Sequence, residues 1–167
     1  MDSQHRTDSQ HPMDSQFMKR AIELSKENLA GNDGGPFGAV IVKNGKIIGE
    51  GKNQVTGNND PTCHAEIQAI RSACSKVQHF ELIGCDIYTS CEPCPMCLAA
   101  IYWARLETIY YGNTRKDAAA IKFDDDFIYS EISLDPAKRT IPMQMCLHKE
   151  AQEVFRSWEK KTDKIPY

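Results

Sequence analysis

Four residues in two short segments have the types and the spacing of a zinc site that activates water. His64 and Glu66 form the first segment, separated by one residue. Cys94 and Cys97 form the second segment and lie three residues apart. Zinc prefers nitrogen and thiolate ligands in a tetrahedron, and two cysteines at this spacing can offer both sulfurs from one helical turn. One histidine and two cysteines leave the fourth position for water, as catalytic zinc sites do.

Glu66 is the candidate proton carrier of this site. Zinc lowers the pKa of a bound water toward about 7, so that the water becomes a nucleophile at neutral pH. A carboxyl group two residues from the histidine can reach that water, and general acid–base transfer contributes about 10²–10⁴-fold to a rate. We therefore expect Glu66 to be catalytic. The expected ligands of one Zn²⁺ are His64, Cys94 and Cys97.

Cys91 allows two other interpretations, because it lies three residues before Cys94. As a fourth ligand it would complete a structural zinc site, and the three-cysteine run also resembles part of an iron–sulfur motif. The next cysteine of that motif is absent, and in both cases Glu66 would have no role. Cys91 is therefore predicted not to be a ligand. A zinc-stabilised binding module remains the non-enzymatic alternative.

The elements that must position these residues follow from hydrophobic periodicity and turn residues. The Asn44-Gly45 pair favours a hairpin, and the later strands alternate with helices, which predicts a layered α/β domain with a mixed sheet. Pro93 suits a first helical turn, whose positive potential favours thiolates. The expected elements are helices at 17–30, 63–75, 93–104 and 149–161, and strands at 37–43, 46–50, 85–90 and 108–112.

Composition limits the organisation and the partners of the chain. Residues 1–16 contain Asp-Ser-Gln three times without apolar periodicity, and they are predicted to be a disordered polar tail before one domain at 17–167. No apolar stretch approaches the roughly 20 residues of a membrane span, and no export signal is visible, so we expect a cytoplasmic protein without disulfides. The net charge of −3 argues against nucleic acid and favours a small-molecule substrate.

The chain resembles the cytidine deaminase-like superfamily and, within it, the bacterial guanine deaminases. A His-x-Glu segment followed by Pro-Cys-x-x-Cys is the signature of zinc-dependent nucleobase deaminases. The resemblance also extends to the Gly-Gly-Pro-Phe-Gly segment and to the final Tyr167. It covers nearly all of the chain after the tail, including residues 34–42, 59–66, 88–97, 100–105 and 123–129.

This resemblance implies a three-layer α/β/α fold around a central five-stranded mixed sheet. It also implies a homodimer whose subunits exchange their C-terminal segments, so that Tyr167 of one subunit closes the substrate site of the other. One Zn²⁺ is expected in each subunit.

The resemblance further implies the residues that bind the substrate, a purine base. Asn53 would hydrogen-bond the edge of the purine, and Phe37 would stack on its ring. Asp125 would recognise the amino group or assist its departure, with the neighbouring Asp124 as the alternative. The implied reaction is hydrolysis of guanine to xanthine and ammonia. Guanosine deaminase and tRNA adenosine deaminase are the alternative activities, and the second requires a basic surface.

Overall fold

A mixed sheet of four strands forms the centre of the fold in the computed structural model, which describes residues 14–167. The strands lie in the order β2-β1-β3-β4. β1 is antiparallel to β2 and to β3, whereas β3 and β4 are parallel, as the sequence predicts. The strands are β1 (Gly38–Lys43), β2 (Lys46–Lys52), β3 (Cys85–Cys91) and β4 (Thr108–Asn113).

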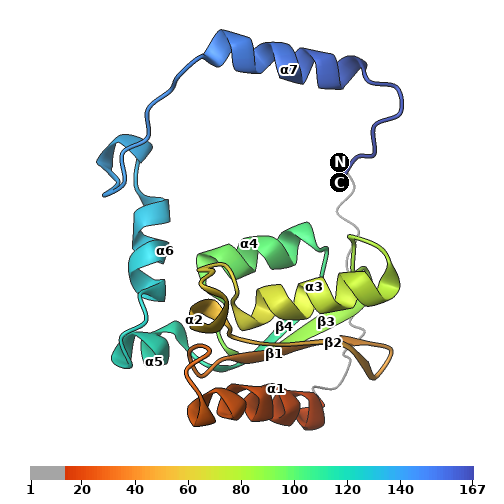
Figure 1. Ribbon diagram of the computed structural model, residues 1–167, viewed down its shortest axis with the longest axis vertical. Helices are drawn as coiled ribbons and strands as arrows, with labels where there is room; N and C mark the ends of the chain where they lie inside the picture. The colour runs from red at the N-terminus through yellow and green to blue at the C-terminus, as the bar shows by residue number, and fades with distance from the viewer. Residues whose placement is uncertain (1–13) are drawn as a thin grey trace, which may run out of the picture.

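Helices cover both faces of this sheet and give the expected three layers (Figure 1). α1 (Ser15–Glu27) lies on one face and is followed by η1 (Asn28–Ala30). α3 (Ala65–Val77) and α4 (Pro95–Trp103) lie on the other face. The short helix α2 (Val55–Asn58) precedes α3. In the part of the chain that the structure describes, no helix is long and apolar enough to cross a membrane.

The two faces of β1 carry separate halves of the core, because successive side chains of a strand point to opposite sides. Val40 and Val42 pack with the α1 residues Phe17 and Leu24. On the other face, Ala39 and Ile41 belong to a cluster that contains the buried alanines of α3. The members of this second cluster are Ala39, Ile41, Ala65, Ala69, Ala73, Leu82, Cys85, Ile87, Ile101 and Ala104.

Two glycines of β2 allow α3 to approach the sheet closely. A Cβ atom on Gly49 would lie 2.5 Å from the carbonyl oxygen of Ala69. On Gly51 it would lie 2.2 Å from that of Ala65. Real Cβ atoms do not tolerate such separations, so any larger residue would push the helix away. This contact fixes the start of α3 beside the end of β2.

The predicted fifth strand is wrong for the described residues. After β4, Thr114 and Asp117 form a capping box that starts α5 (Arg115–Ala120), and the chain continues into α6 (Asp125–Ser133). Pro136 and Pro142 lack the N–H groups that a strand ladder needs. Residues 134–167, here called the C-terminal arm, form only η2 (Pro136–Lys138), α7 (His148–Lys160) and irregular segments.

Several local predictions agree with the structure to within a few residues. Asn44 and Gly45 have φ angles of 50° and 70°, as the expected hairpin turn requires. α1 begins at Ser15 rather than at 17, because the Asp14 side chain accepts a hydrogen bond from Gln16 N and caps the helix. Of the predicted tail, residues 1–13 lie outside the described part of the chain.

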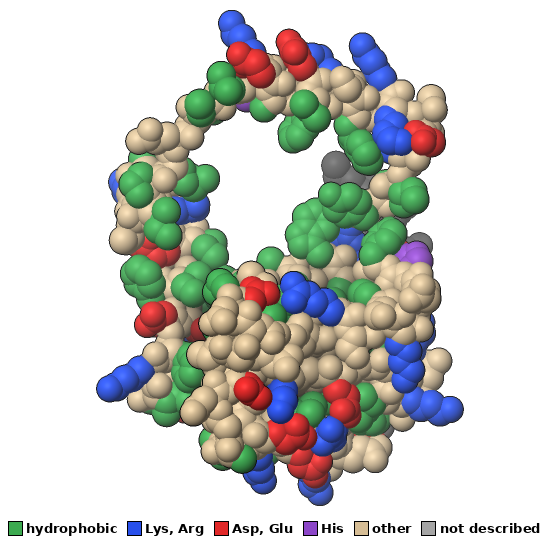
Figure 2. Space-filling view, in the orientation of Figure 1, with side chains coloured by type: hydrophobic (Ala, Val, Ile, Leu, Met, Phe, Trp, Pro, Cys, Tyr) green, Lys and Arg blue, Asp and Glu red, His purple; other side chains and the backbone are tan. Residues whose placement is uncertain are grey.

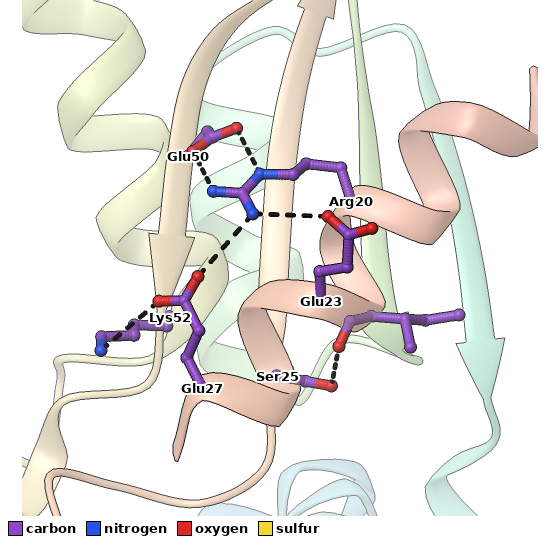
Figure 3. A network of polar contacts seen from close by, with 7 residues as sticks. Arg20, Glu23, Ser25, Glu27, Glu50 and Lys52 are labelled. Atoms are coloured by element: carbon purple, nitrogen blue, oxygen red, sulfur yellow. Dashed lines mark hydrogen bonds and ion pairs between the residues drawn. The ribbon is translucent and has the colours of Figure 1, made fainter. Parts of the chain in front are cut away.

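An ion-pair network fastens α1 to β2 (Figure 3). The guanidinium of Arg20 donates two hydrogen bonds, both of 2.9 Å, to the carboxylate of Glu50. The same guanidinium lies 3.7 Å from Glu27, which also pairs with Lys52 at 3.6 Å. Two parallel charge-assisted hydrogen bonds give this pair a defined geometry, unlike most surface ion pairs.

Replacing Glu50 by Gln should lower the free energy of unfolding by about 1 kcal/mol, since one partner of a half-exposed bidentate pair is lost. The hydrogen bonds from Arg20 lower the pKa of Glu50 below its ordinary 4.5. The pair therefore stabilises the fold above that pH, and its contribution is lost as the pH falls through the lowered pKa. Urea unfolding of both chains at several pH values measures this difference. Glu81→Gln is the control, because the Glu81 side chain forms no ion pair with the described residues, and a pH-independent difference would contradict the prediction.

Candidate active site

Three candidate metal ligands converge where α3 and α4 begin. His64 immediately precedes α3, and Cys94 immediately precedes α4. The Nδ1 atom of His64 lies 3.5 Å from Sγ of Cys94 and 3.5 Å from Sγ of Cys97. Pro95, rather than the expected Pro93, opens α4. The helices pack on one face of the sheet, as predicted, and all three ligand atoms lie within 4.8 Å of one another.

The separations of these atoms fit zinc. Zn–S bonds of about 2.3 Å and Zn–N bonds of about 2.0 Å in a tetrahedron place sulfur and nitrogen about 3.5 Å apart. Hydrogen bonds from Cys97 and His64 lower the pKa of Cys94 to about 4, so a thiolate is present at neutral pH. The neighbouring Cys94 and burial raise the pKa of Cys97, so one negative charge is shared by two sulfurs. A divalent cation would stabilise both as thiolates.

Glu66 lies in the first turn of α3 and is buried, with 6% of its surface exposed. Burial raises the pKa of its carboxyl group to about 7, because the charged form loses its hydration. A carboxyl group with this pKa can accept and return a proton at neutral pH. The position and the pKa of Glu66 thus suit the predicted proton carrier.

A cavity of about 430 Å³ opens beside these residues, within the usual range for small-molecule sites. Its wall includes predicted substrate residues as well as His64, Glu66 and Cys94. The complete lining is Gly34, Gly35, Phe37, Asn53, Val55, Thr56, Pro61, His64, Glu66, Cys91, Glu92, Cys94, Phe123 and Asp125.

The aromatic part of the wall consists of Phe37 and Phe123. Their ring centroids lie 4.7 Å apart with an interplanar angle of 82°, an edge-to-face arrangement that restrains both rings. Phe123 also lines the cavity, although its residue type alone does not mark it as a site residue. Its sequence indications are its place in the 123–129 segment of the family resemblance and its position immediately before Asp124 and Asp125.

Asn28 and the glycine-rich loop, residues 31–36, hold the polar part of the wall. The Nδ2 group of Asn28 donates to the carbonyl oxygens of Gly35, at 2.8 Å, and Asn53, at 2.9 Å. A Cβ on Gly34 would lie 2.2 Å from Oδ1 of Asn53, so only glycine fits there. Asn53 Oδ1 accepts a hydrogen bond from Val55 N–H, which orients its buried amide.

Asp125 also reaches the cavity, as the first residue of α6. Burial raises the pKa of its half-buried carboxyl group above the ordinary value. Asp124 immediately precedes α6 and is exposed, outside the cavity lining. The structure thus places Asp125, and not the alternative Asp124, beside the candidate metal ligands.

Tyr167 is the predicted substrate-binding residue that does not line this cavity. Its side chain is 74% exposed and contacts Phe80 and Trp103, with ring centroids at 6.4 and 5.8 Å. The family resemblance implies that Tyr167 acts at the cavity of a second subunit, which agrees with its distance from the cavity of its own chain.

Cys91 lines the cavity but does not join the group of metal ligands. Within the described residues, the cluster that could hold a metal ion consists of His64, Cys94 and Cys97. The Cys91 thiol instead lies 3.6 Å from the carbonyl oxygen of Thr114. Burial raises its pKa to about 12, so this thiol stays protonated at neutral pH.

Comparisons with known proteins also indicate a zinc site at these residues. The family model for the cytidine and deoxycytidylate deaminase zinc-binding region matches residues 11–113, which include all three candidate ligands. The chain is 50% identical over 151 residues to guanine deaminase of Bacillus subtilis (strain 168), with 90% of this chain and 97% of that protein covered.

Two further relatives differ in their sequence identity to this chain and in how much of it they cover. The X-ray structure of guanine deaminase from Bacillus subtilis matches with a TM-score of 0.88 at 50% identity, over 92% of this chain and 98% of that one. A tRNA-specific adenosine deaminase of Agrobacterium fabrum is 39% identical over 106 residues, which is 64% of this chain and 69% of that protein. The first similarity therefore includes at least part of the C-terminal arm, because 92% of the chain is covered, and the second covers a shorter part of the chain.

The purified chain should contain about one zinc ion, and His64→Ala and Cys94→Ser should lose it, because two ligands hold zinc poorly. Cys91→Ser should keep the metal, since its sulfur lies outside the ligand group. Elemental analysis of each variant gives the stoichiometry. Loss of zinc from Cys91→Ser as complete as from Cys94→Ser would make Cys91 a ligand and contradict the assignment.

Proposed function

The chain belongs to the cytidine and deoxycytidylate deaminase family, and we propose from this premise that it hydrolyses guanine to xanthine and ammonia. The observation that carries the proposal is the buried carboxyl group of Glu66 beside three zinc ligands, at the wall of a cavity large enough for a purine. The 50% identity to a guanine deaminase over nearly the whole chain supports guanine as the substrate.

The proposed mechanism assigns the proton transfers to Glu66. His64, Cys94 and Cys97 would hold Zn²⁺, which would supply a nucleophile by lowering the pKa of a bound water toward about 7. The Glu66 carboxylate takes a proton from the attacking water and delivers it to the ring nitrogen beside the reacting carbon. Glu66 then takes the proton of the hydroxyl group added to that carbon and gives it to the exocyclic amine, so that a carbonyl forms as the C–N bond breaks and ammonia leaves. A pKa of about 7 allows both directions of transfer near neutral pH.

The cavity wall is proposed to orient the base. Phe37 would stack on the purine ring, and its edge-to-face contact with Phe123 supports it in that position. The amide of Asn53 would hydrogen-bond the purine edge, because its Nδ2 group makes no hydrogen bond with the described residues. Asp125 would accept a hydrogen bond from the amino group and assist its departure.

Replacing Glu66 by Gln should lower kcat for ammonia release from guanine by about 10²–10⁴-fold, since the proton carrier is lost. The variant should keep its zinc, because Glu66 is not a ligand. A coupled ammonia assay and elemental analysis measure both quantities. Cys74→Ser, in α3 but outside the cavity, is the control for the helix. Undiminished ammonia release by Glu66→Gln would overturn the proposed mechanism.

Guanosine and tRNA adenosine are the alternative substrates. Relatives named tRNA-specific adenosine deaminases are up to 40% identical, over about two thirds of the chain. The net charge of −3 and a sequence pI near 5.9 disfavour contact with tRNA phosphates. In the same ammonia assay, kcat/KM for guanine should exceed the values for guanosine and for an anticodon stem-loop. A higher value for either would replace guanine as the substrate.

We further propose that the chain works as a homodimer that exchanges its C-terminal arms. α7 stands apart from the sheet and its covering helices, and none of its residues is buried (Figure 1). Val154 and Phe155 are 67% and 78% exposed, and hydrophobic side chains border the open space next to α7 (Figure 2). A second copy would cover these side chains and bring its Tyr167 to the cavity.

Co-expression of two inactive chains tests the exchange. One chain carries Glu66→Gln, and the other lacks residues 162–167. In a mixed dimer the first chain can supply Tyr167 to the intact cavity of the second, so guanine turnover should reappear. Size-exclusion chromatography with light scattering should give about twice 18.8 kDa for the wild type. Mixed dimers that form but stay inactive would contradict the role of Tyr167.

A further inference from the structure

One side chain of α6 connects that helix to the metal-ligand segment. The hydroxyl group of Tyr129 donates a hydrogen bond of 2.8 Å to the carbonyl oxygen of Pro93, the residue before Cys94. Pro93 is buried, whereas no residue of α6 is fully buried. Because little packing holds α6 in place, a directional bond to a buried carbonyl has a large influence on where this helix lies.

Arg115 contacts the face of the Tyr129 ring. Its guanidinium lies 4.7 Å from the ring centroid, a cation–π contact, and its Nε is 3.7 Å from Asp126. The backbone N–H of Arg115 donates to Glu92 at 2.9 Å. The starts of α5 and α6 and the segment before Cys94 are therefore joined through a few polar contacts.

Tyr129 and Asp125 lie four residues apart on α6, so their side chains lie on the same face of the helix. That face carries Asp125 into the cavity and the Tyr129 hydroxyl onto Pro93. A displacement of Tyr129 relative to Pro93 would move Asp125 relative to Cys94 by a similar amount. A shift of about 1 Å in a catalytic group can change a rate by about 10²-fold.

We propose that Tyr129 is a positioning residue, which sets the Asp125 carboxylate relative to the ligand Cys94 through its hydrogen bond to Pro93. This inference rests on the proposed function, in which Asp125 contacts the amino group of guanine. Tyr129 itself lies outside both the cavity lining and the group of candidate metal ligands. Its hydroxyl group acts by fixing α6 against the segment that carries the ligand.

Tyr129→Phe removes the hydroxyl group but keeps the ring against Arg115. We expect kcat/KM for guanine to fall by about tenfold, with zinc content unchanged. In a chain that already carries Asp125→Asn, the same replacement should cause no further loss, because Tyr129 acts through Asp125. A merely structural role would instead give losses that add in the two backgrounds.

Binding without turnover provides an independent measurement. In the Glu66→Gln background, Tyr129→Phe should weaken the affinity for guanine by about three- to tenfold in a calorimetric titration. Arg115→Gln removes the guanidinium but keeps the hydroxyl group, and it should give a smaller loss of the same kind. Tyr111→Phe is the matched control, since the Tyr111 side chain is half exposed and its hydroxyl makes no hydrogen bond with the described residues.

The outcomes separate this inference from the proposed function. If the wild-type chain releases no ammonia from guanine, the proposed function fails. If the wild type is active and Tyr129→Phe matches Tyr111→Phe, the positioning role is overturned. Loss of zinc from Tyr129→Phe, or an equal further loss in the Asp125→Asn chain, would overturn it as well. Only a loss that disappears in the Asp125→Asn background supports it.

Discussion

The meeting of two helix N-termini over one face of the sheet is the constraint on which the rest of the structure depends. His64 precedes α3 and Cys94 precedes α4, so the ligands come together only if both helices start at the same place. The close approach of α3 to Gly49 and Gly51 fixes where α3, and with it His64, begins. The cavity then forms between these starts, the glycine-rich loop and α6.

The local parts of this arrangement could be predicted from the sequence. The His-x-Glu and Cys-x-x-Cys spacings carry their chemistry within one helical turn, and the Asn44-Gly45 turn is decided by its own two residues. Phe37 and Asn53 were predictable only through the family resemblance, because an aromatic or an amide residue alone has no chemical signature. The prediction of a fifth strand is wrong for the described residues. The capping box at Thr114 starts a helix after β4, and the prolines of the C-terminal arm lack the N–H groups that a strand ladder needs.

The contacts that the sequence does not indicate join separate segments of the chain. Asn28 bridges Gly35 and Asn53, and Tyr129 reaches back to Pro93. Neither pairing produces a periodicity or a motif in the sequence, because the partners are brought together only by the folded chain. The raised pKa of Glu66 has the same origin, since burial between a helix and the sheet, rather than any neighbour in sequence, removes its hydration.

The contact between β2 and α3 has a thermodynamic consequence as well as a geometric one. Glycine and alanine lose no side-chain rotamer entropy when they become buried, unlike leucine or methionine. Where Gly49 and Gly51 meet Ala65 and Ala69, no long side chain is ordered. The height of the helix above the sheet is set there by backbone contact rather than by the choice of a rotamer. Backbone thus rests directly on backbone next to His64, the candidate ligand that precedes α3.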